Sequence, residues 1–183
     1  MITIELEGKD YKMPESWDEV SVGLFEEIVK MTSILSEYKS EVQYTIDMFS
    51  VLTGAPADAL SRMTRKGFED LSKATDWVND EVKPGDKRLW VFDGIEYMPV
   101  EKLDSLSMGD SVSLELVIKD SNEATILTNI LPILIRKVKK VQKENGKVKK
   151  VPDDFDADEY EELKNLFKER LMVTDVINLK SFF

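Results

Sequence analysis

Carboxylates at alternating positions form the first group of residues that could do chemistry. The run PDDFDADEYEE at positions 152–162 contains Asp154, Asp156 and Asp158. Alternating oxygen ligands open a calcium-binding loop, but such a loop also needs a central glycine and a closing glutamate. No glycine stands at the required place, so we expect no metal site and no cofactor. The alternative is an acidic loop followed by acids at a helix N-terminus, which the helix dipole favours.

A basic run, RKVKKVQKENGKVKK at positions 136–150, is the second such group. It could bind the phosphates of nucleic acid or an acidic protein surface. It lacks interleaved aromatic residues for base stacking, and a net charge of −11 repels nucleic acid. The alternative is a solvated helix end, neutralised by the acidic stretch that begins at Asp153. The residues that we single out for partner binding are Arg136, Lys137, Lys139 and Lys140.

Cysteine and histidine, on which much enzyme chemistry depends, are both absent from the chain. Without cysteine there is no disulfide, zinc–thiolate site, iron–sulfur cluster or thiol nucleophile. Without histidine, the usual general base near neutral pH and the commonest transition-metal ligand are missing. We therefore expect a protein that is not an enzyme. An enzyme using carboxylates and a divalent ion is the rival, and it would need acids that converge in a pocket.

The C-terminal sequence INLKSFF is apolar and ends in two phenylalanines. Because an apolar segment is costly to leave exposed, it either folds back onto the sheet or inserts into a partner. The residues that would make these contacts are Ile177, Leu179, Phe182 and Phe183.

The elements that position these groups include an internal repeat, because residues 8–23 match residues 94–109 without a gap, at an offset of 86 (94 − 8). Each copy predicts a β-hairpin followed by a helix, with Trp17 or Leu103 filling the corner between them. An isolated hairpin is marginal in water, so we expect the two hairpins to pair in one antiparallel sheet. A pseudo-symmetric ligand surface is the alternative. The identical pairs are Gly8 and Gly94, Tyr11 and Tyr97, Glu15 and Glu101, Asp18 and Asp104, Ser21 and Ser107, and Gly23 and Gly109.

The spacing of apolar residues predicts that most of the remaining chain is helical. Ser16 with Glu19 fits a capping box, Pro132 predicts a kink or boundary, and residues 143–151 read as a basic loop.

The fold class is α+β, predominantly helical with a small antiparallel sheet. We expect a single domain over residues 1–183, with repeat units at about 1–83 and 84–151 and a C-terminal helix and tail at 152–183. The first expected helix begins at residue 22. The others cover residues 41–52, 56–63, 65–79, 110–119, 122–138 and 157–171.

Several stretches, taken in order, resemble a group of small proteins encoded in the structural-gene region of tailed bacteriophages. The group is notable in phages of Bacteroidetes hosts, including the crAss-like phages. Its first-helix pattern is matched by Trp17, Val20, Ser21, Gly23 and Phe25. In ILIRK, a lysine at position 137 stands where the group usually has proline. The stretches are WDEVSVGLFEEIVKM, FSVLTGAPADALSRM, RKGFEDLSKATDWV, LDSLSMGDSVSLE, ILTNILPILIRK and DEYEELKNLFKERLMVTDVINLKSFF.

The resemblance implies a non-enzymatic protein of phage morphogenesis that acts by protein–protein interaction. One version is tail assembly chaperone-like, binding a virion protein such as a tape measure and then leaving. The other is a permanent virion component, either structural or packaged cargo. Partners would be tail, tape-measure-like or portal proteins or further copies of the chain, whereas a nucleic-acid packaging factor using residues 136–150 is a further alternative.

The sequence also bears on where the protein acts. No apolar run approaches the roughly 18–20 residues that cross a bilayer, and the acidic, alternating start is unlike a signal peptide. We therefore expect no membrane contact, and a protein that lies in the host-cell cytoplasm during assembly or within the virion.

Overall fold

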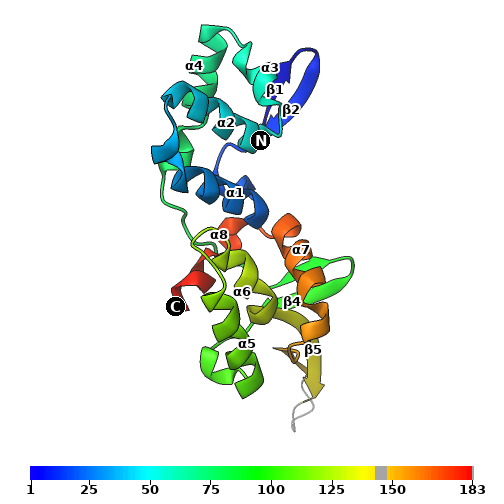
Figure 1. The fold of residues 1–183 in the computed structure, drawn as a ribbon. Helices are drawn as coiled ribbons and strands as arrows, with labels where there is room; N and C mark the ends of the chain where they lie inside the picture. The colour runs from blue at the N-terminus through cyan, green and yellow to red at the C-terminus, as the bar shows by residue number, and fades with distance from the viewer. Residues whose placement is uncertain (143–147, 183) are drawn as a thin grey trace.

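Each repeat unit is a β-hairpin, a short 3-10 turn and a helix of 12 residues in the computed structural model of the chain (Figure 1). The structure describes residues 1–142 and 148–182, and for residues 142 and 180–182 it describes the backbone alone. The first unit comprises β1 (Ile2–Leu6), β2 (Lys9–Met13), η1 (Trp17–Glu19) and α1 (Val22–Ser33). The second comprises β3 (Trp90–Phe92), β4 (Ile95–Pro99), η4 (Leu103–Ser105) and α5 (Met108–Lys119).

The local chemistry of the repeat is the same in both units. The hairpin turns place Glu7 and Gly8, and likewise Asp93 and Gly94, at positive φ, as a two-residue type I′ turn requires. Ser21 and Ser107 cap the two helices, and their hydroxyls accept hydrogen bonds from the amides three residues later at 3.2 and 3.1 Å. The repeat is therefore structural as well as sequential.

One predicted cap is wrong. The Ser16 side chain makes no capping hydrogen bond to η1. The Glu19 carboxylate instead accepts a hydrogen bond from the Glu15 amide at 2.9 Å, one residue before the amide that a capping box would use.

The two hairpins do not pair with each other, contrary to the prediction. β1 and β2 form a two-stranded sheet of their own, and the second sheet has the order β3-β4-β5-β6. Strand β5 (Ile135–Gln142) directly follows helix α6 (Ile126–Leu134) and takes the free edge of β4, while β2 packs against helix α2 (Glu41–Thr53). The α+β class, predominantly helical, is confirmed.

The basic run is a strand where we predicted the end of a helix. Pro132 lacks the amide that would donate within α6, and the helix ends two residues later at Leu134. Val138, predicted to be helical, lies in β5 and pairs with Pro152 of β6 (Val148–Pro152). The predicted loop at 143–151 is thus partly strand, and its residues 143–147 lie outside the described residues.

The other predicted helices are present, with α2 and α5 slightly longer than predicted and the rest shorter. Gly54, at φ 69°, ends α2 in a left-handed conformation. The predicted helix at 65–79 breaks at Thr75 into α4 and η3. The further elements are η2 (Leu35–Glu37), α3 (Ala57–Ser61), α4 (Arg65–Ala74), η3 (Asp76–Asn79), η5 (Ala157–Glu159), α7 (Tyr160–Arg170), α8 (Val173–Val176) and η6 (Ile177–Phe182).

The two halves of the molecule are stacked along its long axis, with α1 at their junction (Figure 1). Helices α6 and α7 from the C-terminal half contact α1. One continuous cluster of buried apolar side chains runs through both halves and includes Val22, Phe49, Ile130 and Phe167. Within the described residues, no helix is both long enough and apolar enough to span a membrane.

Candidate protein-binding surfaces

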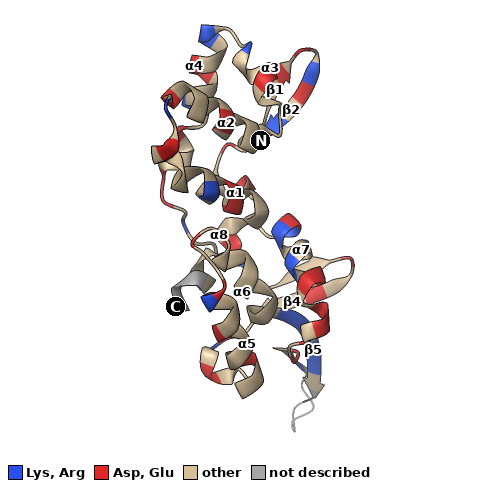
Figure 2. Ribbon diagram, viewed as in Figure 1, with Lys and Arg blue, Asp and Glu red and all other residues tan. Residues whose placement is uncertain are grey.

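The basic and acidic runs lie side by side and pair with each other. Figure 2 shows strand β5, with its lysines, beside the acidic start of α7. Lys137 lies 2.5 Å from the Glu159 carboxylate, and this hydrogen bond raises the pKa of Lys137. Lys139 lies 3.0 Å from Asp153 and 3.2 Å from Asp154. Much of the basic charge on β5 is therefore neutralised within the chain by the acidic stretch, as the alternative interpretation expected, although the run is a strand and not the expected helix end.

Arg136 differs from the neighbouring lysines because it is buried, with 7% of its side chain exposed. Its Nε donates to the Ile133 carbonyl at 2.9 Å, and Nη2 lies 3.2 Å from Asp110 of α5. That contact is an ion pair, since Nη2 has no hydrogen-bond partner in the described part of the chain. Burial raises the pKa of Asp110, but hydrogen bonds from Ser107 and the charge of Arg136 outweigh it and lower the pKa overall. The pair ties α5 to the sheet.

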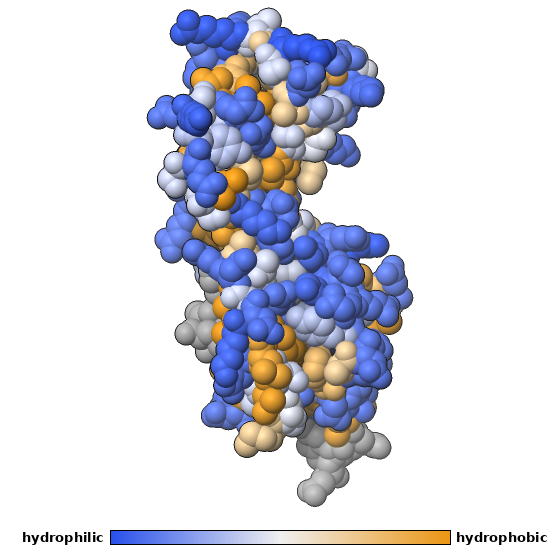
Figure 3. Space-filling view, in the orientation of Figure 1, coloured by the Kyte–Doolittle hydropathy of each residue, from blue (hydrophilic) through white to orange (hydrophobic). Residues whose placement is uncertain are grey.

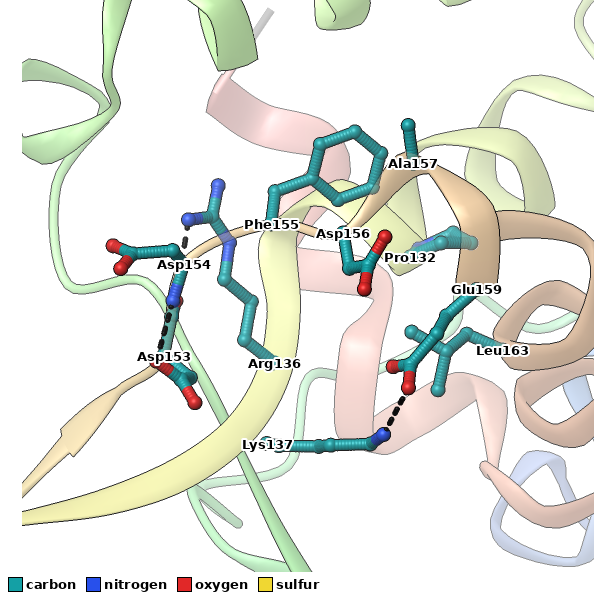
Figure 4. A pocket seen from close by; sticks show the side chains of 10 residues that line it. All are labelled: Pro132, Arg136, Lys137, Asp153, Asp154, Phe155, Asp156, Ala157, Glu159 and Leu163. Carbon is teal, nitrogen blue, oxygen red and sulfur yellow. Dashed lines mark hydrogen bonds and ion pairs between the residues drawn. The ribbon is translucent and has the colours of Figure 1, made fainter.

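A cavity of about 390 Å³ lies beside Arg136, and Figure 4 shows its lining. The Phe155 ring lies 5.9 Å from the guanidinium carbon, and Lys137 reaches across to Glu159. Among the described residues, no group of three acidic, histidine or cysteine side chains is placed to hold a metal ion. Most of the charges that line this cavity are paired within the chain, Lys137 with Glu159 across the cavity, and Asp153 and Asp154 with Lys139 beside it, which is the arrangement of a structural ion-pair cluster.

The C-terminal tail folds back as far as Leu179, but it lies mainly against helices α6 and α8 and not on the sheet as predicted. Leu179 is buried, and Ile177 is half-buried against the core. The Thr174 carbonyl accepts a hydrogen bond from the Gly85 amide at 2.7 Å, which fixes the tail against the link between the two units. Phe182 closes η6, but its side chain and the whole of Phe183 lie outside the described residues. Insertion of these two rings into a partner stays a prediction.

An exposed apolar surface lies on α5, which the sequence interpretation did not select. Met108, Val112 and Leu116 are 81%, 50% and 56% exposed. Their spacing of four residues places them on one face of the helix, and Figure 3 shows hydrophobic surface over the end of the molecule where α5 lies. We call these three residues the open face of α5.

An apolar groove of about 390 Å³ runs beside the open face. Leu103 and Leu106 from η4 and its cap lie along one wall, and Leu114 and Ile118 of α5 line the other. Glu115 and Lys119 stand between groove and open face, and their side chains pair at 2.6 Å. The surface therefore combines an apolar ridge, an apolar groove and a locally neutral charge.

A signal for the open face exists in the sequence. Leu114 and Val117 form the stripe of α5 that packs against the core. The apolar residues at 108, 112 and 116 lie outside this stripe and give the helix a second apolar face. A helix that is apolar on two faces must be covered on both or be exposed on one.

No known protein family, curated protein or solved structure matches this chain significantly.

Proposed function

We propose that the protein is a non-enzymatic assembly factor of tailed bacteriophages, acting in the manner of a tail assembly chaperone. The observation that carries the binding function is the open face of α5. Contiguous exposed apolar side chains, bordered by polar residues, mark sites of protein interaction. Burying each of them in a complex contributes about 1.5–3 kcal/mol.

The phage setting of this proposal rests on the resemblance of the ordered sequence stretches. The charge distribution is compatible with it: the chain carries −11 overall, which favours solubility, whereas the Glu115–Lys119 pair leaves the surface of α5 locally neutral. An apolar segment of a partner protein can therefore approach α5 without meeting a local net charge.

The proposal is tested by quantitative mass spectrometry of particles and infected-cell lysate from the phage that encodes the chain. We expect the chain in the lysate, cross-linked to a virion protein, and depleted from finished particles. Many copies in each particle would overturn the transient role and make the chain a permanent virion component. Failure to cross-link to any virion protein would overturn the phage assembly function altogether.

Two matched substitutions connect the function to the surface. Leu116→Lys places a charge on the open face and should abolish the cross-link. Val42→Lys makes the same change at a residue of α2 that is 58% exposed, and it should leave the cross-link intact. Equal effects of the two substitutions would show that α5 is not the binding surface.

A further inference from the structure

The open face of α5 has an equivalent on α1 that is covered. At the repeat offset of 86, Met108 and Val112 correspond to Val22 and Glu26. Val22 is 1% exposed and Glu26 5% exposed, against 81% and 50% for their equivalents. Two helices with the same bounds within the repeat thus differ in whether this face is occupied.

The occupant of the α1 face is the end of α7 followed by an extended segment. A β-carbon on Gly23 would lie 3.0 Å from the Lys168 carbonyl oxygen, so the absence of a side chain lets α7 approach closely. Lys168 Nζ lies 3.1 Å from the Glu26 carboxylate. The chain then leaves the helix and passes alongside the start of α1.

Two backbone hydrogen bonds hold that extended segment. The Val22 amide donates to the Leu171 carbonyl, and the Val173 amide donates to the Val20 carbonyl, both at 2.9 Å. Together they form a short antiparallel bridge at Ser21 and Met172. The α1 site therefore recognises a helix end through a glycine and an extended segment through the backbone.

The same features are present on α5, where no described residue occupies them. Gly109 stands at the position of Gly23, and among the described residues the nearest atom to a β-carbon there is the Ser107 hydroxyl oxygen at 3.8 Å. Within residues 1–142 and 148–182, neither the Met108 amide nor the Leu106 carbonyl makes a hydrogen bond. Glycine weakens a helix relative to alanine, and nothing in the described fold requires it at position 109.

We infer that this site on α5 binds a segment of a partner protein that consists of a helix end followed by an extended stretch. The inference rests on the proposed function and specifies the form of the bound segment. The partner helix would lie on Gly109 as α7 lies on Gly23, and its extended stretch would pair with the backbone of Leu106 and Met108.

The side chains at the site define the chemistry of the partner. Val112 and Leu116 replace Glu26 and Lys30, so the carboxylate that pairs with Lys168 on α1, and the lysine that shares this carboxylate, are missing on α5. An aliphatic residue must take the place of Lys168, because a lysine there would be desolvated without a carboxylate. Leu171 and Val173 are both buried on α1. The expected motif is therefore an aliphatic residue in the last turn, followed by apolar residues three and five positions later.

A synthetic peptide provides a defined probe for this site. It spans residues 160–176 of this chain with Lys168→Leu, and carries a fluorescent label whose anisotropy reports binding to the full-length protein. We expect saturable binding, weakened at least about tenfold by Gly109→Ala in the protein, because the added methyl group obstructs the helix. The same peptide with the natural lysine should bind at least about tenfold more weakly than the substituted peptide.

Gly109→Ala is a sharp test because it should not harm the free protein. A methyl group at position 109 comes no closer than 3.8 Å to any atom of the described residues, so the variant should melt at the same or a higher temperature. Absence of peptide binding, or binding that Gly109→Ala leaves unchanged, would overturn the inference. Sedimentation that shows a dimer of the native chain and a monomer of Gly109→Ala would also overturn it, by making a second copy the occupant.

The outcomes separate this inference from the proposed function. If the cross-link to a virion protein persists in Gly109→Ala, the assembly function stands and this mode of binding is wrong. If the peptide binds as expected but no virion protein cross-links, the binding mode stands and the phage function is wrong.

Discussion

The backbone carbonyl oxygen of Lys168 lies 3.0 Å from the point that a β-carbon on Gly23 would occupy. This approach brings α7 against α1, at the junction of the two halves of the molecule (Figure 1). Real β-carbons essentially never come closer than this to another heavy atom. A side chain at position 23 would therefore push the Lys168 backbone away by a few tenths of an ångström.

Gly23→Ala should lower the free energy of unfolding by about 1–3 kcal/mol, because the added methyl group forces the two helices apart. The helix propensity of alanine acts in the opposite direction by up to about 1 kcal/mol. Urea denaturation followed by circular dichroism measures the difference. Gly109→Ala is the matched control and should be neutral or stabilising, so destabilisation of similar size in both variants would contradict the role assigned to Gly23.

Glu26 is a buried carboxylate at the same junction, and it should make stability depend on acid pH. It contacts Lys30 Nζ at 2.7 Å, accepts a hydrogen bond from the Thr128 hydroxyl at 2.7 Å and pairs with Lys168. Burial raises the pKa of Glu26, but these hydrogen bonds outweigh it and hold the pKa below its ordinary value of 4.5.

Because the folded-state pKa of Glu26 is lowered, its contribution to stability is fully present above pH 4.5 and is lost as the pH falls through the folded-state value. Glu26→Gln should cost about 2 kcal/mol at pH 7. The difference between native protein and variant should shrink below pH 4.5. Denaturation midpoints measured from pH 3 to 7 would contradict this assignment if the difference were constant.

The Arg136–Asp110 ion pair predicts a large effect from a small change. Asp110→Asn keeps the shape of the side chain but leaves the buried guanidinium without its carboxylate, which should cost about 3 kcal/mol. Glu115→Gln on the same helix removes an exposed ion pair with Lys119 and should cost less than about 0.5 kcal/mol. Thermal unfolding of both variants is the measurement. Equal shifts in melting temperature would show that the buried pair stabilises the fold no more than the exposed pair does.

Much of the fold could be predicted because its signals are local. Turn glycines such as Gly8 and Gly94, and capping serines such as Ser21 and Ser107, act within a few residues of themselves. The pairing of strands is not local. β5 lies next to β4 because α6 ends at Leu134 and returns the chain to that edge, and the alternation of residues 135–142 was hidden by their many lysines.

The candidate sites were harder to predict because exposure depends on tertiary packing. Val22 and Met108 occupy equivalent positions in the repeat, yet α7 covers one and leaves the other open. The lysines of β5 attracted attention as a charged run, although Lys137 and Lys139 are paired with acids more than ten residues away in sequence. Composition alone cannot distinguish a paired charge from a free one.

The paired lysines of β5 predict weak binding to nucleic acid. With a net charge of −11 and the ion pairs of Lys137, Lys139 and Lys150 intact, duplex DNA should bind no more tightly than about 10⁻⁴ M at physiological salt. A gel-shift titration measures this. Binding at micromolar concentration that falls steeply with salt and is lost in Lys140→Glu would favour a nucleic-acid packaging factor instead.

Leu179 tests whether the folded-back tail stabilises the domain. Its side chain is 2% exposed, so Leu179→Ala should leave a cavity and cost about 2–5 kcal/mol in urea denaturation. Leu116→Ala makes the same change at a side chain that is 56% exposed and should cost less than about 0.5 kcal/mol. If the tail instead left the domain to enter a partner in solution, Leu179→Ala would be as mild as the control.

Amide hydrogen exchange distinguishes the two cases further. The Gly85 amide, which donates to Thr174 of the tail, should be protected in the native chain and exchange faster in Leu179→Ala.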